Sequence, residues 1–278
     1  MIKAKIMLWS FFSIALMVTL ALADQKPPWK GTISREGDVI VVNNPKKPQY
    51  GPGSFSLKEN LSIGGRDTAD HVLADITWVS VGRDGTIFVT DAKEKNLKAF
   101  GQDGKFLRTI GRAGEGPGEF RLLSYVHCTS RNEILVVNGM RLSIFKPNGD
   151  HVRDIAASTL SLIDAYPDSR GNFFATLIVR DESNPRYELR KLDNGLKDLF
   201  VLDSSPLSNS ARDGYDPFFP VFRWSALSRD RAVSGYAVKY ELRIHDAKGR
   251  LVRKVEMDPD RISVSLKDIE ERTAGSPP

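Results

Sequence analysis

The side chains that could do chemistry in this sequence are few and widely spaced. Four histidines stand at His71, His127, His151 and His245, and sequence spacing alone brings none of them together. The chain has no Gly-x-Ser-x-Gly elbow, no Cys-x-x-Cys pair, no His-Glu-x-x-His motif and no phosphate loop ending in Lys-Ser or Lys-Thr. A solvated or core role is therefore favoured for each histidine.

The single cysteine, Cys128, cannot form a disulfide within the chain. It ends the apolar stretch 122–128, so a buried, inert thiol is favoured over a nucleophile. The neighbouring His127 is expected on the opposite face of a strand, because side chains alternate along strands. Stability must then come from packing alone.

A glycine-rich loop at residues 111–120 has two interpretations. Its glycines, beside Arg112 and Glu115, could present backbone amides to an anion. The favoured alternative is a crossover between two structural units, in which glycine permits sharp turns and Phe120 packs. Arg112 is kept as a candidate binding residue at the rim.

The aromatic stretch 213–224 is the richest candidate for recognition. Long connections on a rigid scaffold often carry function, and aromatic rings beside arginine suit sugar or peptide binding. The candidate binding residues here are Tyr215, Phe218 and Arg223. The open alternative is that the aromatic rings of this stretch only pack against the scaffold.

The passage 75–120 holds short β-rich runs separated by turn residues, typical of a meander. The expected strands are residues 76–81, 86–90, 97–100 and 106–110. Asp-Gly at 84–85 and at 103–104 suits hairpin turns, which require positive φ. Four antiparallel strands in series make one blade of a β-propeller.

The same pattern recurs in units at 122–155, 161–202 and 222–255. The second turn of each unit falls near residues 103, 148, 194 and 248. This interval matches propeller blades of roughly 40–50 residues. The sequence therefore predicts an all-β fold, a β-propeller of four-stranded antiparallel blades.

The best-formed unit resembles an NHL repeat. The resemblance lies in DGTIFVTD at 84–91, DGKFLRTIG at 103–111 and GEGPGEF at 114–120. The segment 37–64 also resembles the start of the exported bacterial six-bladed β-propeller family with NHL-like repeats. The resemblance implies a six-bladed propeller.

The sequence departs from that family because it supplies too few units. Four whole units are found, with N-terminal strands expected at 38–43 and 55–63, so the six-bladed ring is incomplete. An open ring leaves strand edges unpaired. Either the chain is truncated, or it forms a homodimer, or residues 37–64 fill part of the gap.

A divalent metal is the alternative that this resemblance raises. Sugar-lactonase propellers hold a cation at the central channel, and the oxygen donors to test here are Asp75, Asp91, Asn138 and Asp164. Asp91, at the end of Val-Thr-Asp, is favoured instead as a loop cap that accepts local backbone amides. No cofactor is expected in the favoured interpretation, and calcium is the alternative.

The N-terminus predicts export. Residues 1–23 combine early lysines, an uncharged run and an Ala-Leu-Ala ending, as in a cleaved signal peptide, with an uncleaved anchor as the alternative. The propeller domain is expected at 24–262 and an exposed tail at 263–278. A net charge of +5 with interleaved signs does not favour nucleic acid.

Together these features predict a periplasmic or secreted scaffold. It would bind a peptide, glycan or protein partner on one rim without catalysis, and a cleaved signal would leave it without a stable membrane anchor. The alternative of a different class is a metal-dependent lactonase or hydrolase that works in the central channel.

Overall fold

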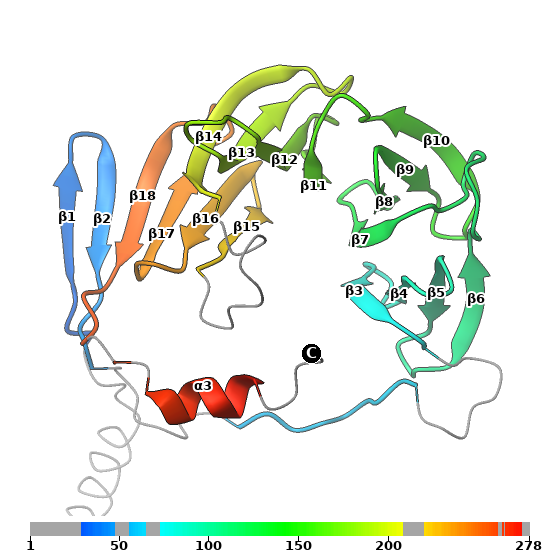
Figure 1. Ribbon diagram of the computed structural model, residues 1–278, viewed down its shortest axis with the longest axis horizontal. Helices are drawn as coiled ribbons and strands as arrows, with labels where there is room; N and C mark the ends of the chain where they lie inside the picture. Colours follow the sequence, from blue (N-terminus) through cyan, green and yellow to red (C-terminus); the bar gives the residue numbers. More distant parts are fainter. Residues whose placement is uncertain are drawn as a thin grey trace, which may run out of the picture.

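The structure, a computed structural model, describes residues 29–47, 56–64, 73–207, 220–260, 263 and 265–273. Four sheets, each built on a four-stranded antiparallel meander, stand side by side in an arc around a common centre (Figure 1). We call these sheets blades I to IV in chain order. The prediction of an all-β, incomplete propeller is confirmed.

Each blade is a meander whose first strand lies nearest the centre of the arc (Figure 1). Blade I contains β3 (Ile76–Val81), β4 (Ile87–Asp91), β5 (Asn96–Phe100) and β6 (Phe106–Ile110). Blade II contains β7 (Leu123–Cys128), β8 (Ile134–Asn138), β9 (Arg141–Phe145) and β10 (His151–Ala156). Blade III contains β11 (Leu162–Pro167), β12 (Phe173–Val179), β13 (Arg186–Leu192) and β14 (Asp198–Pro206). Blade IV contains β15 (Phe222–Leu227), β16 (Arg231–Tyr236), β17 (Glu241–His245) and β18 (Leu251–Glu256).

The turn between the third and fourth strands has the same backbone pattern in every blade. The amide of its fourth residue donates to the carbonyl of its first, as from Gly104 to Gly101 at 2.9 Å. The fourth residue has positive φ, which Gly104 adopts without a steric cost. In blade III the sequence predicted Gly195 for this place, but the structure puts Leu196 there with φ of 64°. The loop is therefore shifted by one residue.

Three apolar clusters lie between neighbouring blades and hold the arc together. Phe88 and Phe120 belong to the cluster between blades I and II, and Phe173 belongs to the cluster between blades II and III. Phe174 and Phe222 belong to the cluster between blades III and IV. Because successive residues of a strand point to opposite faces, Phe173 and Phe174 serve two different interfaces.

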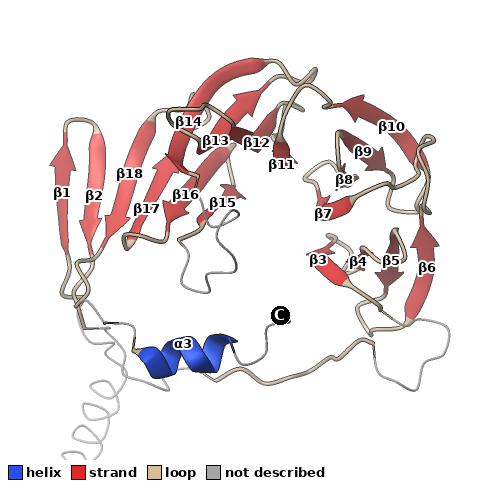
Figure 2. Ribbon diagram, in the orientation of Figure 1, coloured by secondary structure: helices blue, strands red, loops and turns tan. Residues whose placement is uncertain are grey.

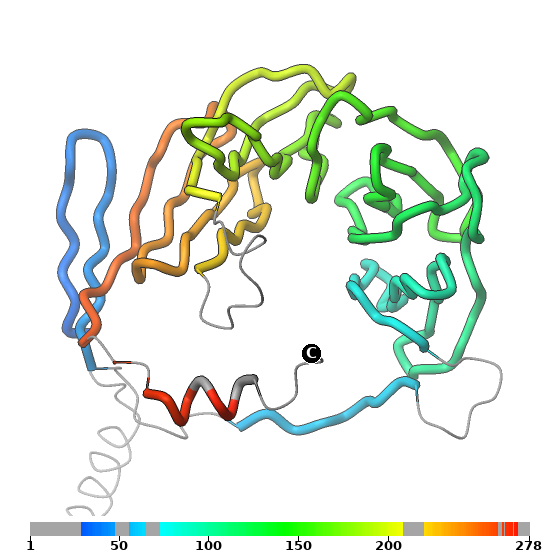
Figure 3. The backbone as a smooth tube through the Cα atoms, in the orientation of Figure 1, coloured from blue at the N-terminus to red at the C-terminus, as the bar shows by residue number. Residues whose placement is uncertain are grey.

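The N-terminal hairpin extends blade IV at its outer edge. Strands β1 (Thr32–Glu36) and β2 (Val39–Asn43) pair with each other, and β2 pairs in parallel with β18 to give a six-stranded sheet (Figure 3). Lys254 of β18 also forms an ion pair with Glu36. The hairpin, which includes residues 37–43, therefore does not lie in the gap of the ring, so this part of segment 37–64 does not fill it.

The prediction of a strand at residues 55–63 is wrong for the described residues 56–63. Residues 56–64 form no strand and run along the open side of the arc (Figure 1). Leu61 and Ile63 lie against the turn at Gly104, where an added Cβ would be 2.7 Å and 3.5 Å from their side chains. Their apolar side chains therefore pack on blade I, and the segment that carries them does not pair as a strand.

The C-terminal segment contains a helix that the sequence analysis missed. Helix α3 spans Leu266–Thr273 and is drawn in blue in Figure 2. Ser265 and Asp268 cap its N-terminus. The Ser265 amide donates to the Asp268 carboxylate at 2.8 Å, and the Asp268 amide donates back to the Ser265 hydroxyl at 3.3 Å. Within the described part of the chain, no helix is long and apolar enough to cross a membrane.

Acid pH is expected to destabilise blade IV through His245. Burial lowers the pKa of this imidazole, whose Nδ1 has no hydrogen-bond partner among the described residues. The neutral His245 imidazole contributes to the free energy of unfolding above the ordinary pKa of about 6.5. This contribution is lost as pH falls through the folded-state pKa. Urea unfolding at pH 7.5 and at pH 5.5 measures the free energy of unfolding. Its decrease between the two pH values should be smaller for His245→Gln than for the unmodified chain. An equal loss in both proteins would contradict this role.

Candidate functional site in the central channel

A pocket opens where the first strands of the four blades face the centre of the arc. Its volume is about 600 Å³, within the range of ligand-binding pockets. We call it the channel pocket. Its principal side chains are Trp78 of β3, Tyr125 and His127 of β7, Asp164 and Tyr166 of β11, and Arg223 of β15.

A histidine and an aspartate from neighbouring blades meet in this pocket. His127 Nε2 lies 2.7 Å from Asp164 Oδ1, and each side chain is 14% exposed. The Ala165 amide also donates to Asp164 Oδ1 at 2.8 Å. Asp164 Oδ2 has no hydrogen bond among the described residues, so this oxygen is available to a ligand.

Aromatic rings form the wall around this pair. Trp78 and Tyr125 meet edge to face with centroids 4.7 Å apart. The Tyr125 ring is parallel to the His127 imidazole within 4°, and Tyr166 meets the same imidazole edge to face at 5.4 Å. Such contacts fix ring orientations and leave a largely preformed apolar surface.

Polar groups that can form further hydrogen bonds or ion pairs also line the pocket. The Thr176 hydroxyl is buried and has no hydrogen-bond partner in the described part of the chain. Buried polar atoms are almost always paired, so this hydroxyl has hydrogen-bonding capacity that a ligand in the pocket can use. Arg223 is exposed at the pocket wall and supplies a positive charge.

Burial in the pocket keeps the Tyr125 phenol and the Cys128 thiol protonated. Burial raises the pKa of the Tyr125 phenol, and the Asp164 carboxylate adds to the effect, while Arg223 opposes it. Burial likewise raises the pKa of the Cys128 thiol. Tyr125 is therefore a neutral hydrogen-bond donor, and Cys128 is a protonated thiol rather than a thiolate.

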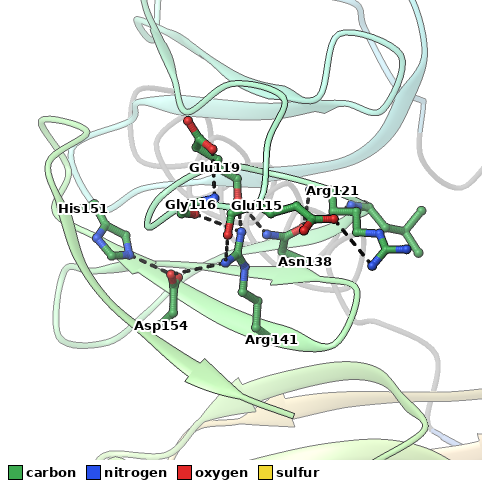
Figure 4. A network of polar contacts seen from close by, with 9 residues as sticks. Glu115, Gly116, Glu119, Arg121, Asn138, Arg141, His151 and Asp154 are labelled. Carbon is green, nitrogen blue, oxygen red and sulfur yellow. Dashed lines mark hydrogen bonds and ion pairs between the residues drawn. The ribbon is translucent and has the colours of Figure 1, made fainter. Parts of the chain in front are cut away.

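The glycine-rich crossover loop, in contrast, satisfies its own polar groups (Figure 4). Glu119 accepts the Gly116 amide at 2.8 Å and pairs with Arg112 at 2.8 Å. Arg141 of β9 donates to the carbonyl oxygens of Glu115 and Gly116 at 2.9 and 3.1 Å. The acidic side chain of the loop thus occupies the place that an external anion would need, as expected for a structural crossover.

Two of the proposed metal ligands act as loop caps. Asp91 accepts the amides of Ala74 and Glu94 at 2.9 and 3.1 Å and pairs with Lys98 at 3.1 Å. Burial alone would raise the pKa of the Asp91 carboxyl, but these amides and Lys98 hold it below its ordinary value.

Asn138 occupies the corresponding place in blade II. Its Oδ1 accepts the amides of Arg121 and Leu122 at 2.9 and 3.1 Å. Asp75 is exposed and donates its own amide to Asp91. Asp164 lies on another blade with His127, and no group of three or more His, Cys, Asp or Glu side chains suited to a metal ion occurs among the described residues.

The sequence of blades I and II matches a known family. The matching segment begins before β3 and ends within β11, and the family is described as a 6-bladed beta-propeller. The match covers residues 67–165, about a third of the chain. The expected resemblance to six-bladed propellers is thereby confirmed. No curated protein matches this chain.

One solved structure shares the fold of this chain, and two others resemble it less closely. A protein from Bacteroides fragilis described as exported has a TM-score of 0.55 and 12% identity, with 84% of this chain and 65% of that protein covered. A Bacteroides caccae protein of unknown function has a TM-score of 0.41 and 16% identity over 65% of this chain and 60% of its own. Virginiamycin B lyase from Staphylococcus aureus has a TM-score of 0.41 and 11% identity over 68% of this chain and 56% of its own. This chain therefore spans about 65% of the length of the first protein, and that likeness concerns the fold.

The candidate residues named from the sequence lie in different parts of the propeller. Arg223 and Asp164 both line the channel pocket, whereas Arg112 belongs to the crossover loop. Tyr215 and Phe218 lie outside the described residues. Of the aromatic side chains that follow them, Phe222 stacks on Tyr187 with centroids 6.5 Å apart, as the packing alternative predicted.

Sequence reasoning missed His127, the central side chain of the propeller pocket. It treated the histidines as scattered, because residues 127 and 164 are far apart in sequence. The repeats did contain a signal, since both residues stand on the first strand of a unit. First strands line the channel of a propeller, so residues on them are candidates for one site.

Proposed function

We propose that this chain is an exported β-propeller that binds an acidic glycan in the channel pocket. The observation that carries the proposal is the combination of aromatic walls with unused polar groups in one pocket of about 600 Å³. Aromatic faces suit the C–H faces of sugar rings, while Asp164, Thr176 and Tyr125 can bond hydroxyl groups. Arg223 suits a sugar carboxylate.

Export is part of the same proposal. The signal-peptide pattern at residues 1–23 supports it, and so does the fold shared with a Bacteroides fragilis protein that is described as exported. The periplasm or the cell exterior is where a bacterial protein meets polymeric glycans. The proposal places the binding site at the channel, whereas the sequence had suggested one rim.

Replacing Trp78 with alanine should weaken glycan binding by at least about tenfold, because the ring is a wall of the pocket. Trigalacturonate titrated into the protein, followed by calorimetry, measures the affinity. Trp29→Ala is the matched control, since Trp29 is 39% exposed against 40% for Trp78 but stands before β1. It should bind like the unmodified chain.

Three results would count against the proposal. Equal affinity of Trp78→Ala and the unmodified chain would remove the channel pocket as the site. Equal binding of a neutral glucan trimer would remove the role given to Arg223. Equal binding of an acidic tripeptide would assign the pocket to peptides instead of glycans.

A further inference from the structure

The channel pocket holds the parts of an acid–base catalyst, and this inference rests on the proposed glycan binding. His127 Nε2 lies 2.7 Å from Asp164 Oδ1, so the carboxylate accepts the Nε2 proton. This bond favours the tautomer with its proton on Nε2, in which Nδ1 carries the lone pair. His127 Nδ1 has no hydrogen bond within the described part of the chain. It is therefore a base whose orientation is set by Asp164.

A proton donor and a cation accompany this base. The Tyr125 ring is parallel to the imidazole, with centroids 6.3 Å apart, and its phenol keeps its proton because of burial. The positive charge of Arg223 is close enough to act on the Tyr125 phenol. The base and the acid thus both come from β7, and the cation comes from β15.

The side chains that line the channel pocket favour one class of reaction over others. Glycoside hydrolysis normally needs two carboxyl groups across the scissile bond. Among the described residues that line the pocket, only Asp164 carries a carboxyl group, and its Oδ1 is engaged by His127. Acyl transfer needs an activated nucleophile, whereas the Cys128 thiol stays protonated. A single base beside a guanidinium instead suits removal of a proton next to a carboxylate.

We propose that the channel pocket cleaves a uronic-acid glycan by β-elimination. His127 Nδ1 removes the proton on the carbon that bears the carboxylate, while Arg223 binds that carboxylate and stabilises the charge that develops on it. The C–H electron pair forms a carbon–carbon double bond, and the glycosidic C–O bond on the next carbon breaks. The leaving oxygen takes the Tyr125 proton.

The reaction is balanced without an oxidant, a reductant or water. One chain end becomes an unsaturated uronate and the other a free hydroxyl group. The proton on His127 then returns to the Tyr125 phenolate through solvent. His127, Tyr125 and Arg223 are the catalytic residues, and Asp164 is a positioning residue that acts through the imidazole.

The test is an assay of the purified full chain on polygalacturonate and alginate. The conjugated double bond of the product gives an ultraviolet absorbance that hydrolysis does not produce. His127→Ala should lower kcat by about 10²-fold or more, the range of general-base catalysis. His151→Ala is the matched control, because His151 also pairs with an aspartate, Asp154, but stands on the outer strand β10. Its kcat should stay unchanged.

Asp164→Asn tests the positioning role separately. It should lower kcat and alter the pH profile of kcat, with little change in KM, because an asparagine favours the wrong tautomer. Trigalacturonate affinity, measured in parallel, separates the two proposals. A chain that binds trigalacturonate but forms no unsaturated product overturns the elimination and leaves glycan binding intact. A chain that binds none of these glycans overturns both, and equal losses in His127→Ala and His151→Ala overturn the role of His127.

Discussion

Replacing Asp168 with alanine is expected to lower the free energy of unfolding by about 3–5 kcal/mol, the cost of leaving a buried charge unpaired. Asp168 follows β11, and its carboxylate lies 2.7 Å from Lys191 Nζ, with the two side chains 4% and 3% exposed. It also accepts the amides of Arg170 and Asn172. Burial already lowers the pKa of Lys191, so its ammonium depends on this partner. Urea unfolding of the variant measures the loss.

Asp193→Ala is the matched control in the same blade. Asp193 accepts the amides of Gly195 and Lys197 at an exposed turn, but it has no buried lysine to neutralise. Its replacement should cost about 1 kcal/mol, the value of lost turn hydrogen bonds. Similar losses in the two variants would show that Asp168 acts only as a turn cap. The interaction with Lys191 would then contribute little.

Replacing Phe120 with alanine is expected to cost about 3–5 kcal/mol, as for other fully buried aromatic side chains. Phe120 is 0% exposed and lies between blades I and II, with its ring 5.6 Å from that of Phe145. Gly111 makes room for it, since a Cβ there would fall 2.2 Å from the Phe120 ring. The cavity would open at the contact that joins the two blades. The measurement is the midpoint and slope of urea unfolding.

Leu122→Ala provides the comparison within the same crossover. Leu122 is 62% exposed, so its truncation should change the free energy of unfolding by less than about 1 kcal/mol. A Phe120→Ala variant as stable as Leu122→Ala would mean that the blades do not depend on this contact. The rest of the apolar cluster and the contacts of Arg141 and Glu119 would then hold the blades together.

The blades could be predicted from sequence because their signals are local. Gly85 and Gly104 supply the positive φ that these hairpin turns need, and short β-rich runs lie on either side. Leu196 shows where such reasoning fails. The hairpin register of blade III places a leucine at the positive-φ position, although glycine stands one residue earlier. Strand register outweighed the preference of a single residue.

Contacts between distant segments could not be predicted in this way. The parallel pairing of β2 with β18 joins residues such as Val41 and Lys254, which no local pattern connects. Leu61 and Ile63 alternate with polar residues as a strand would, yet they cover a turn of blade I. For helix α3 a local signal did exist, the Ser265-x-x-Asp268 cap.

The candidate site could be predicted only in part for the same reason. Asp164 and Arg223 were selected separately, one as a metal ligand and the other as a recognition residue, and the fold brings both to one pocket. His127 was set aside because its partner lies on the next blade. Residues that are far apart in sequence can be assigned to one site only when the order of the blades is known, because that order places each first strand at the channel.

Amide hydrogen exchange with and without trigalacturonate tests the channel site most directly. Saturating ligand should slow exchange in the channel-lining strands β3, β7, β11 and β15, because binding stabilises the segments that it contacts. The outer strands β6, β10, β14 and β18 should exchange at unchanged relative rates. Slower exchange confined to the crossover loop at residues 111–120 or to the outer strands would contradict a ligand site in the channel.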